Sequence, residues 1–147
     1  MAVLGDGEVV YNGNPGGATA SNFTVSGGQV TLPAAYGKIL LGIRSVSDLE
    51  TLELDAQGSD IRDKRKNVQN VSLLIDESPH GFMVGPDEEH LFAEKPEPWE
   101  DPGELTTKLV DVTVTSEWST KGQLFIRHDD PLPFAVLGII PNLEVGG

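Results

Sequence analysis

The sequence contains no cysteine, few basic side chains and few aromatic ones. Because cysteine is absent from its 147 residues, disulfide scaffolds, thiol nucleophiles and thiolate metal sites are excluded. Three histidines, His80, His90 and His128, are available for a catalytic triad, and no nucleophile-elbow motif accompanies them. A chain of this length is nevertheless long enough to bury a core as one domain without disulfide support.

Long apolar runs are also lacking. No stretch has the roughly 20 apolar residues that a membrane-spanning helix needs. The first eight residues contain neither the basic start nor the apolar run of a secretion signal. We therefore expect no membrane-spanning segment.

Basic residues are scarce relative to acidic ones: 10 against 23, which gives a net charge of -13. Since nucleic-acid binding depends largely on cations that displace condensed counterions, this balance argues against a conventional DNA or RNA binder. The charges are unevenly distributed. Ten acidic residues and a single lysine, Lys95, lie between Asp76 and Glu104. Four of the ten basic residues form what we call the basic cluster: Arg62, Lys64, Arg65 and Lys66.

Glycine and proline are plentiful, and their spacing indicates the fold class. The 17 glycines and 10 prolines fall at short intervals between β-branched stretches, and no helical apolar stripe persists. The sequence predicts an all-β protein, an antiparallel β-sandwich or partly open barrel of short strands with one long acidic loop. We expect a single domain, in which residues 1–37 form a Gly/Asn-rich β-ribbon and residues 38–147 the main sandwich or barrel.

Individual strands can be assigned from the pattern. Ser26-Gly27-Gly28 predicts a hairpin turn, and Val110, Val112 and Val114 alternate with polar residues as in a half-buried strand. Further expected elements are a central strand over 38–44, a strand over 48–54, an internal strand over 67–76 with 81–85 as its hairpin partner, and a strand over 123–127 that forms a hairpin with 110–115.

The closing stretch is the most apolar in the chain. Every residue from Phe134 to Ile140 is apolar or glycine, and prolines 131, 133 and 141 bracket the run. Such a short run predicts a strand buried on both faces near the middle of the fold. The expected core residues in it are Phe134, Val136, Leu137, Ile139 and Ile140.

The acidic loop extends from Pro86 to Gly103 and contains Trp99. Loops of this length inside a compact domain are usually functional or mobile. One interpretation is a solvated connection. The other is a loop that reaches a neighbouring subunit with Trp99 as the anchor, because aromatic residues are enriched at interfaces.

Catalytic and metal sites are poorly supported. His128-Asp129-Asp130 offers three donors in sequence, but neighbouring strand residues point to opposite faces, so a solvated turn is the better interpretation. Carboxylate pairs for glycoside hydrolysis cannot be recognised from sequence, since their separation is unknown. We predict no enzyme activity, no catalytic or metal residues and no cofactor, and keep a carboxylate hydrolase as a third alternative.

Three segments, in order, resemble one protein family. They are Gly42-Ile43-Arg44 with Ser47 to Leu54, then Lys64-Arg65-Lys66-Asn67-Val68 leading into a strand and Gly81 to Gly85, and the ending Pro131 to Val145. Together they are similar to the C-terminal region of the tail nozzle proteins of short-tailed phages, also called tail tubular protein B or packaged-DNA stabilisation protein. The resemblance covers roughly Val30 to Val145. Since family members run to several hundred residues, we expect the chain to be a C-terminal domain of a longer protein.

The resemblance implies a structural function. It implies a virion structural protein that forms a ring, hexameric in the full protein, at the end of a phage tail. Its partners would be copies of itself and other tail proteins, with packaged DNA passing through rather than bound. It would reside in the virion tail after assembly in the host bacterial cytoplasm. The expected subunit interface pairs the basic cluster with acidic-loop residues: Arg62, Lys64, Arg65 and Lys66 with Asp87, Glu88, Glu89 and Trp99.

A carbohydrate- or receptor-binding β-sandwich is the alternative. In that case Trp99, Trp118 and Tyr36 would stack on sugar rings. Only nine aromatic residues exist, and several are needed for the core.

Overall fold

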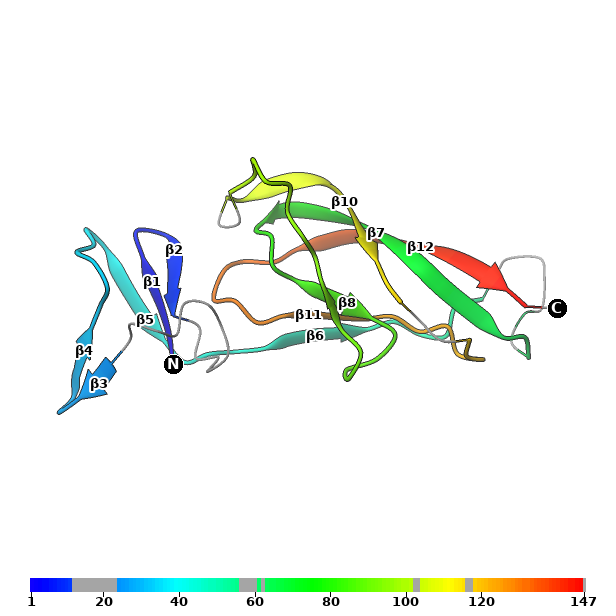
Figure 1. Ribbon diagram of the computed structural model, residues 1–147, viewed down its shortest axis with the longest axis horizontal. Coiled ribbons are helices and arrows are strands. Elements are labelled where there is room, and N and C mark those ends of the chain that lie inside the picture. Colours follow the sequence, from blue (N-terminus) through cyan, green and yellow to red (C-terminus); the bar gives the residue numbers. More distant parts are fainter. Residues whose placement is uncertain (12–23, 56–60, 62, 102–103, 116–117, 147) are drawn as a thin grey trace. The chain divides into compact units, whose positions relative to one another are not determined.

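The computed structural model describes residues 1–11, 24–55, 61, 63–101, 104–115 and 118–146 (Figure 1). These residues form strands, turns and irregular segments without a helix, and every strand pair is antiparallel. The all-β prediction is therefore confirmed. The described residues accordingly contain no helix of the length and apolarity needed to cross a membrane.

Twelve strands are described. Their bounds are β1 Ala2–Gly5, β2 Glu8–Tyr11, β3 Thr24–Ser26, β4 Gln29–Thr31, β5 Ile39–Gly42, β6 Ser47–Glu50, β7 Lys66–Ser78, β8 Met83–Gly85, β9 Phe92–Ala93, β10 Thr106–Thr113, β11 Phe125–His128 and β12 Val136–Val145. The chain divides into two compact units. Unit 1 comprises Met1–Val46 with Asp129–Leu132, and unit 2 comprises Ser47–His128 with Pro133–Gly147.

Unit 1 contains a small sheet of order β2-β1-β5 and the hairpin β3-β4. Asp6 and Gly7 both have positive φ, 53° and 96°, in the tight turn between β1 and β2. The Asp6 carboxylate accepts hydrogen bonds from the backbone N–H groups of Gly37 at 3.0 Å and Lys38 at 2.7 Å. One side chain thereby fixes the start of β5 beside the first hairpin.

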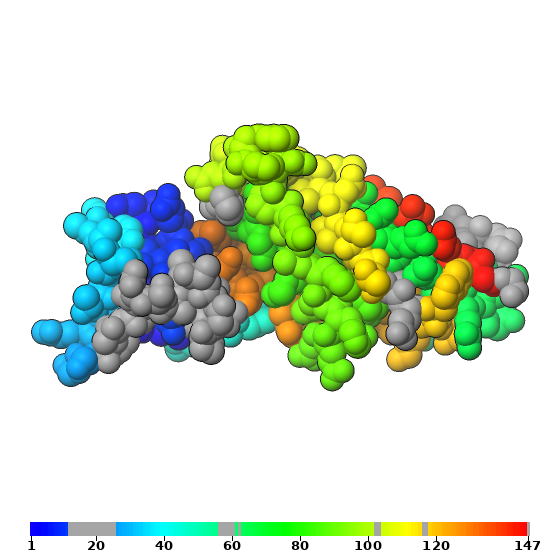
Figure 2. All heavy atoms as spheres, viewed as in Figure 1, coloured from blue at the N-terminus to red at the C-terminus, as the bar shows by residue number. Residues whose placement is uncertain are grey.

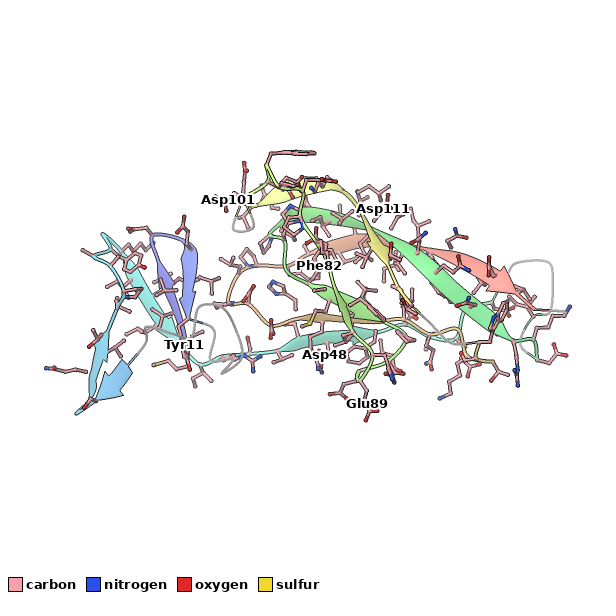
Figure 3. The ribbon with its side chains drawn as sticks, in the orientation of Figure 1. Tyr11, Asp48, Phe82, Glu89, Asp101 and Asp111 are labelled. Atoms are coloured by element: carbon pink, nitrogen blue, oxygen red, sulfur yellow. The ribbon has the colours of Figure 1, made fainter. Side chains whose placement is uncertain are left out.

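Unit 2 is a two-layer sandwich. One sheet has the order β10-β7-β12 and the other β6-β11-β8-β9. Their facing sides enclose one apolar cluster, with Phe82 between the layers and Asp111 on the outer side (Figure 3). The cluster consists of Val68, Val71, Leu73, Ile75, Phe82, Val84, Val110, Val112, Val114, Leu124 and Ile126.

Two local predictions are confirmed. Gly27 and Gly28 have φ of 58° and 78° and turn β3 into β4, because glycine adopts this region without steric cost. Val110 and Val112 in β10, with Val114 just after it, all face the core. In both cases the signal lies within a few consecutive residues.

Two predicted pairings are wrong. Met83–Gly85 is not a hairpin partner of β7, because β8 pairs with β11 and β9 in the opposite sheet. Phe125–His128 likewise pairs with β6 and β8 rather than with β10. Near the end of β7, Glu77 has φ 41° and Gly81 has φ 98°, and this bend carries the chain from one layer to the other.

The prediction of a doubly buried closing strand is also wrong. β12 lies at the edge of its sheet and pairs only with β7. Phe134, Val136 and Ile139 pack against the core, as predicted, but Leu137 is 63% and Ile140 58% exposed. Pro141 within β12 suits an edge position, because proline cannot donate to a ladder. β5 is similarly an exposed edge strand, so the expectation of a central strand over 38–44 fails too.

Gly85 gives a test of the packing between β8 and the loop that follows it. A Cβ at this position would lie 1.9 Å from the carbonyl oxygen of His90, a backbone atom that cannot rotate away. We expect Gly85→Ala to lower the free energy of unfolding by about 1–3 kcal/mol, measured by urea denaturation. The matched control is Gly138→Ala, whose Cβ would meet Leu74 at an ordinary 3.8 Å. Equal unfolding midpoints for the two variants would contradict the close approach.

Candidate functional site

The most exposed tryptophan lies at the tip of a well-defined turn. Trp99 is 81% exposed, and it occupies the third position of a turn that we call the Trp99 turn, residues Glu97 to Glu100. The backbone N–H of Glu100 donates to the carbonyl oxygen of Glu97 at 2.9 Å, and Pro98 occupies the second position, which proline favours. In Figure 2 the segment 86–101 lies on the face of unit 2 turned to the viewer.

Glu100 clamps this turn to the sandwich. Its carboxylate accepts from the backbone N–H of Glu97 at 3.0 Å and forms an ion pair with Lys108 on β10. Glu94, a buried carboxylate of the same segment, lies 2.7 Å from Nδ1 of His80. Nε2 of His80 is 3.6 Å from Glu100, which is ion-pair range but too long for a hydrogen bond. The buried imidazole thus lies near both carboxylates but is hydrogen-bonded to Glu94.

The hydrogen-bond donors around Glu100 lower its pKa. The hydrogen bond from Lys108, followed by that from the backbone of Glu97, holds the pKa of Glu100 below its ordinary value of 4.5. Because the folded-state pKa is lowered, the clamp contributes stability above the unfolded-state pKa. That contribution is lost as the pH falls through the lowered folded-state value.

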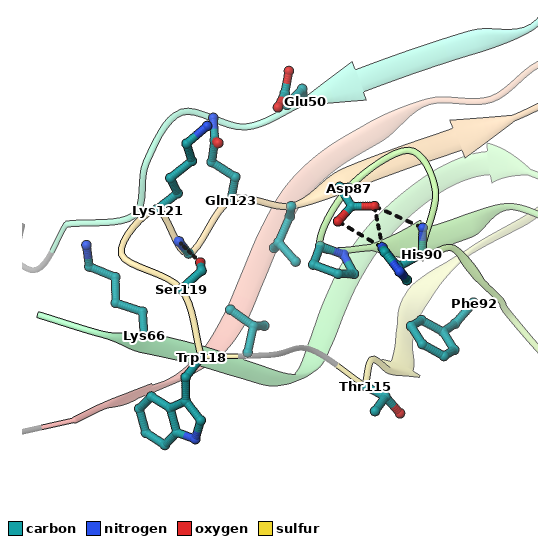
Figure 4. A pocket seen from close by; sticks show the side chains of 14 residues that line it. Glu50, Lys66, Asp87, His90, Phe92, Thr115, Trp118, Ser119, Lys121 and Gln123 are labelled. Carbon is teal, nitrogen blue, oxygen red and sulfur yellow. Dashed lines mark hydrogen bonds and ion pairs between the residues drawn. The ribbon is translucent and has the colours of Figure 1, made fainter.

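One cavity of unit 2 measures about 600 Å³. Its apolar lining comes from Val68, Pro86, Phe92 and Leu124, and its charged and polar lining from Glu50, Lys66, Asp87, His90, Lys121 and Gln123. Figure 4 shows Lys66, Lys121 and Gln123 on one side and the Asp87–His90 pair on the other. Trp118 also borders it. The size is within the range of small-ligand and side-chain pockets, roughly 300–1,000 Å³.

Lys66 is an unusual member of this lining because it is only 1% exposed. Its ammonium donates one hydrogen bond, to the carbonyl oxygen of Thr120 at 2.7 Å, and among the described carboxylates none forms an ion pair with it. Gly122 lies against its methylene chain, since a Cβ there would be 2.9 Å from the Lys66 Cδ. A buried ammonium whose acceptor among the described residues is one neutral carbonyl oxygen can bind an additional anionic group favourably.

The acidic residues on the opposite side are already engaged. Asp87 lies 2.8 Å from Nδ1 of His90 and accepts backbone N–H groups of Glu89 and His90. The hydrogen bond from His90, the largest contribution, lowers the pKa of Asp87. Glu88 pairs with Arg127 at 2.9 Å. Arg127 also pairs with Asp48, and this bond lowers the pKa of Asp48.

The structure separates the predicted interface residues. Lys64 and Arg65 are exposed, but Lys66 is buried and lines the 600 Å³ cavity, so it does not share the open surface of the other two. Its position is explained by the strand period, because Lys66 shares the inward face of β7 with Val68. Arg62 lies outside the described residues. Asp87, Glu88, Glu89 and Trp99 are all exposed on the acidic loop.

The acidic loop is more ordered than a solvated connection. It contains β9, which pairs with β8, and Glu94 in it is only 6% exposed. The aromatic residues considered for sugar stacking lie in different surroundings. Trp118 borders the 600 Å³ pocket without Trp99, and Tyr36 lies against Gly5 in unit 1. In the part of the chain that the structure describes, no group of three acidic or histidine side chains could hold a metal ion.

A second surface feature lies on the outer face of the sheet β10-β7-β12. Leu109, Leu74 and Gly138 are directly paired across the three strands, and Ile140 pairs with Ser72 on the same face. Leu137 lies in the bulge beside Gly138. We call the exposed apolar residues of this face the apolar strip: Leu74 at 37%, Leu109 at 53%, Leu137 at 63% and Ile140 at 58% exposed.

Sequence reasoning missed several of these residues. Lys121 and Gln123 gave no signal, because a polar residue in a turn region is unremarkable. His80 and Glu94 were not recognised as a pair, since they are 14 positions apart and belong to no known spacing motif. The burial of Lys66 could have been detected, because Lys66 lies two positions before Val68 and therefore points to the same face of the strand.

Comparison with known proteins adds no identification. The chain matches no protein-family model and no curated protein sequence.

The clamp on the Trp99 turn is testable through the mobility of Trp99. In a Trp118→Phe background, Trp99 is the sole tryptophan and its fluorescence anisotropy reports the turn. We expect Glu100→Ala to lower this anisotropy, because the ion pair to Lys108 and the bond to the Glu97 backbone are both lost.

Acidification should produce the same change. As the pH falls below 4.5 and through the lowered pKa of Glu100, the anisotropy of Trp99 should fall, and the Glu100→Gln variant should lack this step. An unchanged anisotropy in Glu100→Ala would show that the turn is held by other contacts.

Proposed function

We propose that this chain is a structural module of a short phage tail, part of the ring-shaped nozzle that retains packaged DNA and conducts it outward. Its partners are further copies of itself and other tail proteins, and it resides in the virion tail after assembly in the bacterial cytoplasm. The support is the ordered resemblance of three segments, the all-β architecture and one surface observation.

That observation is the apolar strip. The run from Phe134 to Ile140 has the composition of a strand buried on both faces, yet the folded chain covers only one of them. Leu137 and Ile140 remain exposed beside Leu74 and Leu109. Burial of such side chains contributes about 1.5–3 kcal/mol each, so a neighbouring copy that covers the strip would gain substantial free energy.

The strip alone is too small for a stable interface. Specific interfaces bury about 1,600 Å² in total, with an apolar centre and a polar rim. Four side chains can supply the centre. The rim would come from polar neighbours on the same face, which include Asn70, Ser72, Asp111, Thr113 and Asn142.

The charge of the chain suits a conduit. With a net charge of -13, its surface repels the phosphates of DNA, and few cations are available to hold them. DNA can then slide past without being retained by specific contacts. This supports passage of DNA rather than recognition of it.

The test is the native mass of the chain over a concentration series, at low and high salt, with negative-stain images of the same samples. We expect assemblies of several copies. Ile140→Lys should raise the concentration of half-assembly at least about tenfold, because a lysine would be buried without a partner. The variant should keep the unfolding midpoint of the wild type, since Ile140 is exposed in the single chain.

The matched control is Leu52→Lys. Leu52 is 87% exposed but lies outside the outer face of β10-β7-β12, so assembly should be unaffected. A wild-type chain that stays monomeric at every concentration and salt would contradict the proposed function. Retention of double-stranded DNA at physiological salt would contradict the proposal that DNA passes without binding.

A further inference from the structure

Unit 2 has an exposed indole, that of Trp99, and a cavity that the Trp99 side chain of the same copy does not fill. Trp99 is 81% exposed, and it is not among the residues that line the 600 Å³ cavity. We propose that the Trp99 turn of one copy inserts into this cavity of the next copy. The inference rests on the proposed function in that it names a contact between copies in addition to the apolar strip.

The protruding part is preorganised for insertion. The Glu97–Glu100 hydrogen bond closes the turn, and the ion pair from Glu100 to Lys108 ties it to β10. The chain just before the turn is held by buried Glu94, which is hydrogen-bonded to buried His80. Because the backbone around Trp99 is already fixed, little conformational entropy is lost when the indole is buried. Tryptophan in this setting is the residue type most often found as an interface hot spot.

The cavity has the matching shape and chemistry. Its volume exceeds that of one indole ring, and half-buried Pro86 contributes apolar surface to its lining. Phe92, half-buried at the side, can pack edge-on or offset against an entering ring. Gln123 offers an amide oxygen for the indole N–H.

The charges of the two surfaces are complementary. Trp99 is flanked by the acidic residues Glu97, Glu100 and Asp101. The cavity presents Lys66 and Lys121, with exposed Lys64 and Arg65 just before Lys66 in sequence. The lining also includes two carboxylates: Asp87, which is hydrogen-bonded to His90, and Glu50. The acidic Trp99 turn therefore enters a cavity in which lysines line one side and orient the turn.

The two surfaces are different parts of the same chain, which determines the symmetry of the contact. Such a contact is heterologous: each copy offers its turn to one neighbour and its cavity to another. A heterologous contact repeats until the copies close into a ring, or continues as a filament. The proposed nozzle requires the first of these outcomes.

The contact is tested first with variants that leave the fold of the single chain intact. Trp99→Ala and Lys121→Glu alter exposed side chains, and each should raise the concentration of half-assembly about tenfold or more. Lys38→Glu, an exposed lysine in unit 1, is the control for added negative charge and should have no effect. Combining Lys121→Glu with Glu97→Lys restores opposite charges and should recover assembly. Unchanged assembly in both single variants would overturn the contact and leave the ring proposal standing.

The second test does not require a ring. A peptide of residues 95–101 is titrated into the full chain, and amide signals of the cavity residues are followed by NMR, with the same peptide carrying alanine for Trp99 as the control. We expect shifts at Phe92, Gln123 and Leu124 with the tryptophan peptide only.

If the chain never assembles but this peptide binds, the contact is supported and the proposed function is not. No shift at the cavity, together with unchanged assembly of the Trp99→Ala variant, overturns the inference. Shifts there with an oligogalacturonate, and none with the peptide, also overturn it and identify a site for acidic sugars.

Discussion

The structure of unit 2 depends on the burial of one face of β7 against the opposite sheet. Val71, Leu73 and Ile75 are fully excluded from water, and they touch the layer that contains β8 and β11. β7 is also the middle strand of its own sheet, so it sets the register of both β10 and β12. A shift of β7 by one residue would turn all three side chains outward. The pairing register of both neighbouring strands would then be lost as well.

Prediction from the sequence succeeded where the cause of a structure is local. Gly27 and Gly28 specify a turn by their own dihedral angles, and the alternation around Val110 and Val112 specifies which face of β10 is apolar. Pairing partners were predicted poorly, because adjacency in sequence does not tell which layer a strand joins after a bend such as that at Gly81. Burial was overestimated for Leu137, since composition shows that a side chain is apolar but not whether the same chain covers it.

The candidate site was predicted in outline only. Trp99 on an acidic loop was recognised as a possible anchor, and its exposure agrees with that role, although binding by it stays a prediction. The cavity was not recognised, because its lining comes from segments far apart in the chain, from Glu50 to Leu124. The tie between the loop and β10 was not predictable either. It depends on Glu100 meeting Lys108 after the loop has folded back.

The pairing of β7 with β12 has a consequence for synthesis of the chain. Gln69 and Glu144, hydrogen-bonded across this pair, are 75 positions apart. A nascent chain that emerges from the ribosome therefore presents β7 with one edge unpaired until β12 has been made. During that interval its apolar face and free N–H groups are open to other chains and to chaperones. Completion of this sheet therefore requires synthesis of β12, and a chain arrested before β12 is expected to expose the unpaired edge of β7.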